Sequence, residues 1–228
     1  MKKAVVVLSG GLDSTTCMGI ARDAGYELYP LTFHYGQRHD REVEQAKKIA
    51  AFYRVPHHRI VTLDFLKQIG GSALTDETIA VPVGGVNEAG ENDIPSTYVP
   101  ARNLIFLSLA TAYAEVVGAE VVYIGVSAVD YSGYPDCRPE FIRAMNETIG
   151  LATKAGIAGA GIRIEAPLVH LSKKETIEWG LRLGVPYELS TSCYQGGEEA
   201  CGECDSCRLR LKGFADAGAK DPIPYKKR

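Results

Sequence analysis

The residues Ser9-Gly10-Gly11-Leu12-Asp13-Ser14 follow directly on the apolar run Ala4-Val5-Val6-Val7-Leu8 near the start of the chain. The β-branched run predicts a buried parallel strand, and the pattern of residues 14–24 predicts a helix. A strand that turns sharply into a helix presents backbone N–H groups and the positive end of the helix dipole to an anion. The stretch therefore predicts a phosphate-binding corner at the head of an α/β domain.

The residue types in this corner suit phosphate. The glycines let the backbone approach phosphate oxygens, and Ser9 and Ser14 add hydroxyl donors. Asp13 would repel phosphate unless it accepts hydrogen bonds in the turn or faces a phosphate-bound Mg²⁺. Two familiar phosphate loops are excluded, because no lysine follows the glycines and the glycines are adjacent. The alternative is an ordinary glycine-rich turn between a strand and a helix.

Length and composition limit the class of protein. The 228 residues suit one domain, or one with a small appendage, and 46% of them are hydrophobic. No apolar run reaches the roughly 18 residues of a membrane span, and Met1-Lys2-Lys3 leads straight into a strand, so we expect a cytoplasmic protein. A net charge of −3 and a pI of about 6.0 favour small charged substrates over nucleic acid.

Strand-like and helix-like patterns alternate along the rest of the chain. This alternation predicts a doubly wound, mostly parallel α/β sheet with helices on both faces. The helix that ends at Val117 is nearly all apolar, so we expect it to be buried. Residues 68–100 exceed an ordinary connection and predict a lid, a substrate loop or a dimer arm. The other predicted elements are strands at 27–33, 58–63, 121–126 and 162–165 and helices at 40–53, 139–154 and 172–183.

Open parallel sheets bind ligands at the carboxyl ends of their strands. Polar, aromatic loops follow three predicted strands, at residues 9–14, 34–39 and 127–138. Arg102 and Lys173 would join them and neutralise a phosphate or carboxylate, although each alone is also typical of a solvated charge.

Five further side chains carry two interpretations each. His34 either takes part in acid–base chemistry or is a satisfied histidine at the edge of the core. Tyr131 and Tyr134 either stack on a planar heterocycle or only pack. Asp130 and Asp136 either accept hydrogen bonds from an amino-substituted ring or cap a turn.

Four cysteines close to the C-terminus carry the strongest metal signal. Cys193, Cys201, Cys204 and Cys207 have the spacing C-x₇-C-x₂-C-x₂-C, which suits tetrahedral Zn²⁺, with an iron–sulfur cluster as the alternative. A site closed by four sulfurs has no open position for substrate, so its role would be structural.

The cysteines also suggest a domain organisation. We expect residues 1–185 to form the nucleotide-binding domain and residues 186–228 a zinc-binding segment whose last helix packs on it. Of the other cysteines, Cys17 is typical of a small core residue, whereas Cys137 lies in a candidate substrate loop and its role stays open.

Strings spread over essentially the whole chain resemble the bacterial 7-cyano-7-deazaguanine synthases of queuosine biosynthesis, the QueC family. The first string alone is similar to the pyrophosphate loop, S-G-G-x-D-S, of the N-type ATP pyrophosphatases, or PP-loop superfamily. The aspartate-rich loop and the four-cysteine ending narrow the resemblance to this member. The matching strings are residues 8–14, 33–38, 99–103, 125–130, 134–138 and 171–173, with the terminal cysteines.

The resemblance implies a C–N bond-forming ligase with an adenine nucleotide alpha hydrolase-like, Rossmann-like fold. It would convert 7-carboxy-7-deazaguanine and ammonia to 7-cyano-7-deazaguanine, using ATP with Mg²⁺, through an adenylated carboxylate and an amide. Ammonia would come from solution, the pyrophosphate loop favours AMP over ADP as the product of activation, and a homodimer is expected.

The implied residue roles fall into three groups, besides the four zinc ligands. ATP would be held by Leu8, Ser9, Gly10, Gly11, Leu12, Asp13, Ser14 and Thr15. The catalytic set would be Asp13, Ser14, Lys173, Arg102 and His34. The deazapurine acid would be bound by Tyr35, Gln37, Asp130, Tyr131, Tyr134, Asp136 and Arg138. His34, Asp130 and Asp136 are candidates for the base that deprotonates the attacking nitrogen.

Two other functions fit parts of the sequence. A tRNA-thiolating enzyme of the PP-loop superfamily would use the cysteines for sulfur transfer or an iron–sulfur cluster. It predicts a basic surface or an appended RNA-binding domain, and the sequence indicates neither. A non-enzymatic zinc ribbon would use the four cysteines for partner binding and would leave the phosphate-binding corner without a role.

Overall fold

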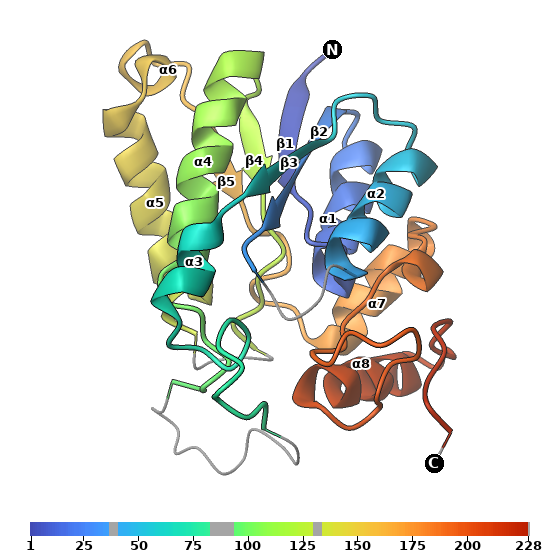
Figure 1. Cartoon of the computed structure of the whole chain (residues 1–228). Helices are drawn as coiled ribbons and strands as arrows, with labels where there is room; N and C mark the ends of the chain where they lie inside the picture. The colour runs from blue at the N-terminus through green and yellow to red at the C-terminus, as the bar shows by residue number, and fades with distance from the viewer. Residues whose placement is uncertain (37–40, 83–93, 130–133, 228) are drawn as a thin grey trace.

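The computed structural model describes residues 1–36, 41–82, 94–129 and 134–227 (Figure 1). Across these ranges, five parallel strands form one sheet in the order β3-β2-β1-β4-β5. The strands are β1 (Lys3–Val7), β2 (Glu27–His34), β3 (Arg59–Thr62), β4 (Val121–Tyr123) and β5 (Arg163–Glu165). The α-helices are α1 (Leu12–Asp23), α2 (Arg41–Phe52), α3 (Asp64–Ile69), α4 (Arg102–Val117), α5 (Pro139–Ala152), α6 (Lys154–Ile157), α7 (Lys173–Arg182) and α8 (Asp205–Asp216).

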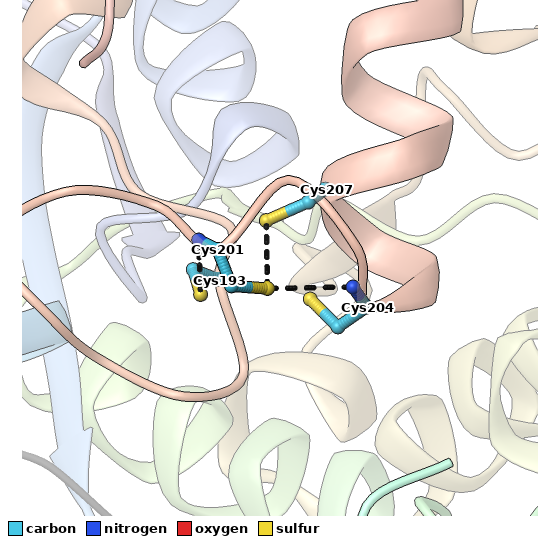
Figure 2. A group of neighbouring side chains, drawn as sticks. All are labelled: Cys193, Cys201, Cys204 and Cys207. Atoms are coloured by element: carbon cyan, nitrogen blue, oxygen red, sulfur yellow. Dashed lines mark hydrogen bonds between the residues drawn. The ribbon is translucent and has the colours of Figure 1, made fainter. Parts of the chain in front are cut away.

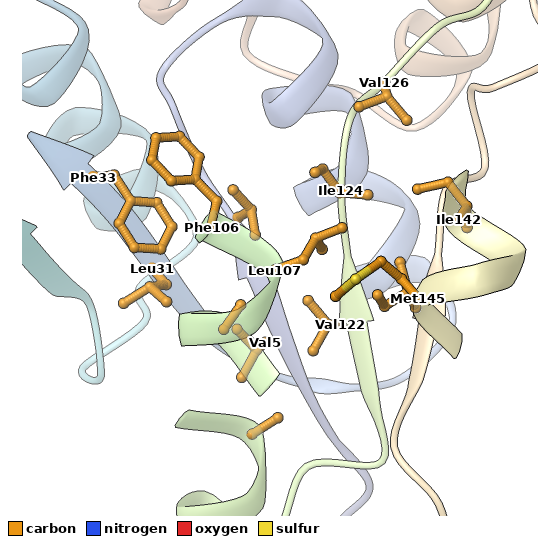
Figure 3. Packing of buried hydrophobic residues seen from close by; sticks show 14 of the residues in the cluster. Val5, Leu31, Phe33, Phe106, Leu107, Val122, Ile124, Val126, Ile142 and Met145 are labelled. Atoms are coloured by element: carbon orange, nitrogen blue, oxygen red, sulfur yellow. The ribbon is translucent and has the colours of Figure 1, made fainter. Parts of the chain in front are cut away.

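Helices cover both faces of the sheet, so the prediction of a doubly wound α/β fold is confirmed (Figure 1). The side chains of β1 alternate between two cores: Val5 and Val7 pack toward α4 and α5, whereas Ala4 and Val6 pack toward α1 and α2. Figure 3 shows the first core, in which residues of β1, β2 and β4 meet α4 and α5.

The prediction that the helix ending at Val117 is buried is wrong for one of its faces. α4 packs on the sheet through Phe106, whose ring stacks on that of Phe33 with centroids 4.1 Å apart. On the other side, Leu104, Leu109 and Val116 are 43%, 37% and 85% exposed. A helix that is apolar almost all round shows no periodicity that could reveal its exposed face.

Several boundaries differ from the sequence-based expectation. α1 begins at Leu12 rather than at residue 14, and the short helix α3 was not predicted. The helix expected over residues 139–154 ends at Ala152, because the Thr153 side chain accepts a hydrogen bond from Gly156 N and starts α6. The capping box predicted at Ser172 and Glu175 is present and starts α7.

β4 is shorter than predicted because the chain leaves the sheet beside the phosphate-binding corner. A Cβ atom on Gly125 would lie 2.7 Å from the carbonyl carbon of Asp13, so only glycine fits this crossing. Among the described residues between α3 and α4, Ala73 N donates a hydrogen bond to Ser96 O, 2.8 Å long. Whether residues 68–100 act as a lid, a substrate loop or a dimer arm stays a prediction.

The two parts of the chain on either side of the boundary proposed at residue 185 pack against each other through a shared hydrophobic cluster. Leu12 of α1, Ile177 of α7 and Phe214 of α8 belong to one buried cluster, with Val185 and Tyr187 between them in sequence. The division into residues 1–185 and 186–228 therefore stays a prediction about the chain's organisation. Within the described parts of the chain, no helix has the length and apolar character needed to span a bilayer.

Candidate functional site

The phosphate-binding corner, residues 9–14, lies between the end of β1 and the start of α1. Gly10 has a φ of +85°, and a Cβ atom there would clash with the carbonyl oxygen of Glu42, so α2 packs against the loop where glycine is required. Gly11 is the N-cap of α1 and offers no side-chain cap. The first turn of α1 therefore keeps an uncapped, electropositive end toward the cavity.

The hydroxyl groups of the corner are present as predicted, and they also shape the loop itself. Ser9 Oγ and Ser14 Oγ lie 3.0 Å apart, and Ser14 Oγ also accepts from Ser9 N at 3.2 Å. Thr15 Oγ1 donates to Gly11 O at 2.7 Å. These contacts pre-form the turn, which would lower the entropic cost of binding the phosphate that the sequence predicts.

The carboxylate of Asp13 has a partner that sequence reasoning did not consider. Lys173 Nζ donates to Asp13 Oδ1 at 2.7 Å and to Oδ2 at 2.9 Å. The capping box at Ser172 fixes where α7 starts and so places Lys173 at its first residue, beside the loop. The corner therefore contains a salt bridge between the carboxylate of Asp13 and the ammonium of Lys173, which are 160 positions apart in sequence.

A cavity of about 220 Å³ opens in front of this corner, beyond the ends of β1, β2 and β4. It brings together residues that the sequence analysis had placed in one site. The predicted site residues that line it are Leu8, Ser9, Gly11, Leu12, Asp13, Ser14, Tyr35, Arg102, Tyr134 and Lys173.

Other predicted site residues lie elsewhere. Gly10 and Thr15 shape the loop, and His34 and Arg138 are outside the cavity lining, with Arg138 exposed. The remaining candidates, Gln37, Asp130 and Tyr131, lie outside the described residues. Their roles stay predictions.

Arg102 supplies the second cation of the cavity. Its Nη1 donates to the hydroxyl of Tyr35 at 3.3 Å, and its guanidinium lies 5.8 Å from the centre of that ring. Burial lowers the pKa of Arg102, but Tyr35, Tyr134 and other neighbours raise it by more, so the guanidinium stays charged. Lys173 and Arg102 thus face the cavity from two different helices, which suits an anionic ligand.

Asp136 is held inside the protein instead of pointing into the cavity. Its Oδ2 accepts a hydrogen bond from Asn103 N at 2.9 Å, and the residue is 7% exposed. This contact satisfies a backbone donor in the first turn of α4, which agrees with the capping alternative. A role for Asp136 in binding substrate is a prediction that this geometry does not favour.

Cys137 lines the cavity, and its environment indicates an unreactive thiol. Burial, with a smaller contribution from Asp136, raises the pKa of Cys137 to about 12. Because the thiolate is the nucleophilic form, the thiol is poorly suited to covalent catalysis at neutral pH. The geometry therefore favours a packing role for Cys137, which the sequence analysis had left open.

The four C-terminal cysteines form a second candidate site, shown in Figure 2. Their sulfur atoms all lie within 4.8 Å of one another, and Cys201 and Cys207 are 3.9 Å apart. Tetrahedral Zn²⁺ with bonds of about 2.3 Å would separate its sulfur ligands by about 3.8 Å. Hydrogen bonds with the thiols of Cys204 and Cys207 lower the pKa of Cys193, which favours a thiolate there. The donor set and its spacing therefore fit a metal ion such as zinc.

Comparison with known proteins identifies the family. The model of the family described as "Queuosine biosynthesis protein QueC" matches residues 3–218. The chain belongs to the QueC family. The 7-cyano-7-deazaguanine synthase of Oceanobacillus iheyensis is 65% identical over 98% of both chains. That of Desulfitobacterium hafniense is 60% identical over 99% of this chain and 94% of the relative.

A solved structure supports the fold of this QueC chain. The NMN synthetase from Francisella tularensis matches with a TM-score of 0.52 and 16% identity, over 96% of this chain and 78% of that one. At this identity the likeness concerns architecture alone. The family resemblance drawn from the sequence strings is confirmed by the family model and the curated relatives.

Sequence reasoning missed several polar contributions to the cavity of this QueC chain, among them those of Asn103, Ser127, Tyr194 and Ser206. Glu42 of α2, Arg210 of α8 and the segment 191–192 line it. Glu42 and Arg210 occur in amphipathic helices, where a charged residue is usually solvated, so no local signal marks them. Thr191 and Ser192 immediately precede the predicted metal ligand Cys193, and this position next to a predicted site was the signal that could have marked them.

Proposed function

We propose that this QueC-family chain uses ATP to convert 7-carboxy-7-deazaguanine and ammonia into 7-cyano-7-deazaguanine, a precursor of queuosine. The observation that carries the proposal is that relatives up to 65% identical over nearly the whole chain bear the name of that synthase. The cavity supports it, since a pre-formed loop suited to an anion and the cationic side chains of Lys173, Arg102 and Arg210 surround one space at the end of the sheet.

The first step activates a poor acyl donor. The substrate carboxylate attacks the α-phosphorus of ATP, forming an acyl-adenylate as pyrophosphate leaves. The loop at residues 9–14 would hold the pyrophosphate portion, and Lys173 would neutralise charge that develops on the leaving group. Mg²⁺ bound to the phosphates would supply further positive charge, and we propose that Asp13 would be the carboxylate that holds it.

The following steps build the nitrile. Ammonia attacks the acyl carbon, loses a proton and expels AMP, which gives the amide. A second adenylation of the amide oxygen turns it into a leaving group, and loss of AMP and of the protons on nitrogen leaves C≡N. A loop that grips pyrophosphate favours AMP as the product of both activations.

Glu42 is the residue we assign to accept the proton of the nitrogen nucleophile. Among the described residues, Asp13 and Glu42 are the carboxylates that line the cavity, and Asp13 is held by Lys173. Burial raises the pKa of Tyr35, Arg102 lowers it and the charge of Glu42 raises it, so the Glu42 carboxylate is electrostatically coupled to that hydroxyl within the same cavity. Ammonia is mostly ammonium at neutral pH, so a carboxylate there would both attract the cation and accept its proton.

The remaining proposals concern metal, assembly and location. We propose zinc as a structural ion at the four cysteines, because four sulfurs leave no open coordination position. We propose that the exposed apolar face of α4, with Leu151 of α5 at 82% exposure, packs against a second copy in a homodimer. A reducing cytoplasm would keep the cysteines available to the metal.

Acid-dependent ATP–pyrophosphate exchange tests the proposed function. We expect exchange of labelled pyrophosphate into ATP only when 7-carboxy-7-deazaguanine is present, and no stimulation by tRNA. Exchange that requires tRNA would support a thiolating enzyme instead, and its absence with the acid would refute adenylation.

A further inference from the structure

A buried arginine of α8 lies against the nucleotide cavity. Arg210 is 1% exposed and lines the cavity behind the phosphate-binding loop. Its Nε and Nη2 donate to the two carboxylate oxygens of Asp221 at 2.8 and 2.9 Å, and the Asp221 side chain is 3% exposed. A charge this deeply buried persists only when paired, so the guanidinium is fixed in place by this two-point contact.

The other donors of Arg210 reach a short segment that follows α7. Nη1 donates to Ser190 Oγ at 2.8 Å and to Ser192 Oγ at 3.4 Å. Nη2 also donates to Tyr187 O at 3.1 Å. The arginine therefore holds this segment on both sides of Thr191.

Thr191 is the residue that meets the phosphate-binding loop. Its N–H donates to Gly10 O at 2.9 Å, and Gly11 pairs with it as a parallel β-bridge. Gly10 and Gly11 are the two glycines whose backbone forms the anion-binding turn. Residues 190–192 therefore support the loop through backbone contacts with its two glycines.

The cysteine cluster is linked both to the segment 190–192 and to α8, which carries Arg210. Cys193 follows Ser192 directly, and Cys207 precedes Arg210 by one helical turn in α8. A metal ion held by the four thiolates would join the segment that contacts the loop to the helix that carries Arg210.

We propose that Arg210 is a positioning residue that couples the metal centre to nucleotide binding. Anchored by Asp221, it holds residues 190–192 against Gly10 and Gly11, so that the loop fits the pyrophosphate portion of a nucleotide. The coupling rests on the proposed use of ATP. Because coupling between two sites is reciprocal, a bound nucleotide also tightens the hold on the metal.

The first test separates positioning from general stability. Arg210→Met should raise the KM for ATP by about 10- to 100-fold, the loss expected for hydrogen bonds from a charged group. The KM for the deazapurine acid and the metal content should stay within about twofold, and Arg210→Lys should recover part of the loss. Arg208→Met, at an exposed position on the same helix, is the matched control.

The outcome that overturns the proposal is an unchanged KM for ATP, or an equal rise in the KM for both substrates. Should Arg210→Met fail to fold, the double variant Ser190→Ala/Ser192→Ala removes two acceptors and keeps the Arg210–Asp221 pair. It should raise the KM for ATP by a smaller factor of the same kind, and an unaltered value would equally overturn the proposal.

The second test measures the reciprocal effect without any turnover. Zinc-loaded wild-type protein is exposed to a chromogenic chelator with and without Mg-ATP, and metal release is followed by absorbance. We expect Mg-ATP to slow release at least severalfold in the wild type and much less in Arg210→Lys. ATP binding measured by calorimetry with no effect on release would refute the coupling and leave the proposed function standing, whereas no ATP binding would refute both.

Discussion

Replacing Lys173 by methionine removes the cation that faces the phosphate-binding loop and keeps most of the apolar stem. The lysine side chain is 11% exposed and that of Asp13 30%, so the pair is neither on the surface nor fully buried. Losing one partner costs about 3–5 kcal/mol for a buried pair and about 0–1 kcal/mol for an exposed one, so we expect about 1–2 kcal/mol of stability to be lost.

The effect on catalysis should be larger. Lys173 is placed to stabilise charge that develops on departing pyrophosphate, and removing one such donor typically lowers the rate by about 10²- to 10³-fold. The assay is acid-dependent ATP–pyrophosphate exchange at a temperature where circular dichroism shows the variant folded. The matched control is Lys174→Met, since Lys174 is 49% exposed and, among the described residues, pairs with Glu178 at 3.7 Å; it should change exchange by less than about twofold.

A double variant distinguishes a role toward the nucleotide from a role toward Asp13 alone. If Lys173 served only as the counter-ion of Asp13, then Asp13→Asn would relieve the unpaired charge and restore the affinity of Lys173→Met for metal-free ATP, a readout that does not need the Mg²⁺ assigned to Asp13. We expect no restoration. Recovery in the double variant, or a loss no greater than that of Lys174→Met, would refute the assignment of Lys173 to the leaving group.

Three further changes test other parts of the site and fold. Glu42→Gln should leave acid-dependent exchange unchanged but slow amide formation by about 100-fold. Hydroxylamine supplied in place of ammonia is uncharged at neutral pH and should recover most of the rate, and no recovery would reject Glu42 as the base. Cys204→Ser should lower bound zinc and the midpoint of thermal unfolding together, while Cys17→Ser should leave the zinc content unchanged. Burial, then Lys47, lowers the pKa of His58 in the folded protein, so the unfolded chain takes up the proton first as the pH falls and the free energy of unfolding decreases. In His58→Gln, the free energy of unfolding should therefore decrease less between about pH 7.5 and 5.5, as measured with denaturant at both values.

The phosphate-binding corner and the sheet could be predicted because their signals are local. A β-branched run, two adjacent glycines and a helical pattern occur together between Ala4 and Ala24, and each indicates the same structure. The cysteine cluster was equally accessible, since two residues between Cys201 and Cys204, and between Cys204 and Cys207, are typical of metal sites.

The partners of the charged groups could not be predicted, because no local pattern joins them: Lys173 and Asp13 are 160 positions apart, and Arg210 and Asp221, 11 apart, share no helix or strand. Lys173 meets Asp13 across the fold, and Arg210 meets Asp221 only after the chain has turned back past α8. Each of these residues in isolation is typical of a solvated charge. A single sequence holds no record of such pairs.

The exposed face of α4 was missed for a different physical reason. Periodicity reveals a buried face only when polar residues occupy the other one, and residues such as Leu104 and Val116 hide that contrast. The same apolar character that obscured the face also makes it the candidate for the dimer contact.

The central claim is that one cavity uses ATP to turn a deazapurine carboxylate into a nitrile with nitrogen taken from ammonia. The most direct measurement incubates zinc-loaded protein with 7-carboxy-7-deazaguanine, Mg-ATP and isotopically labelled ammonium, and analyses the products by mass spectrometry. The account predicts 7-cyano-7-deazaguanine with the label in its nitrile, together with AMP and pyrophosphate. Recovery of the unchanged acid under conditions in which the protein binds ATP would contradict it.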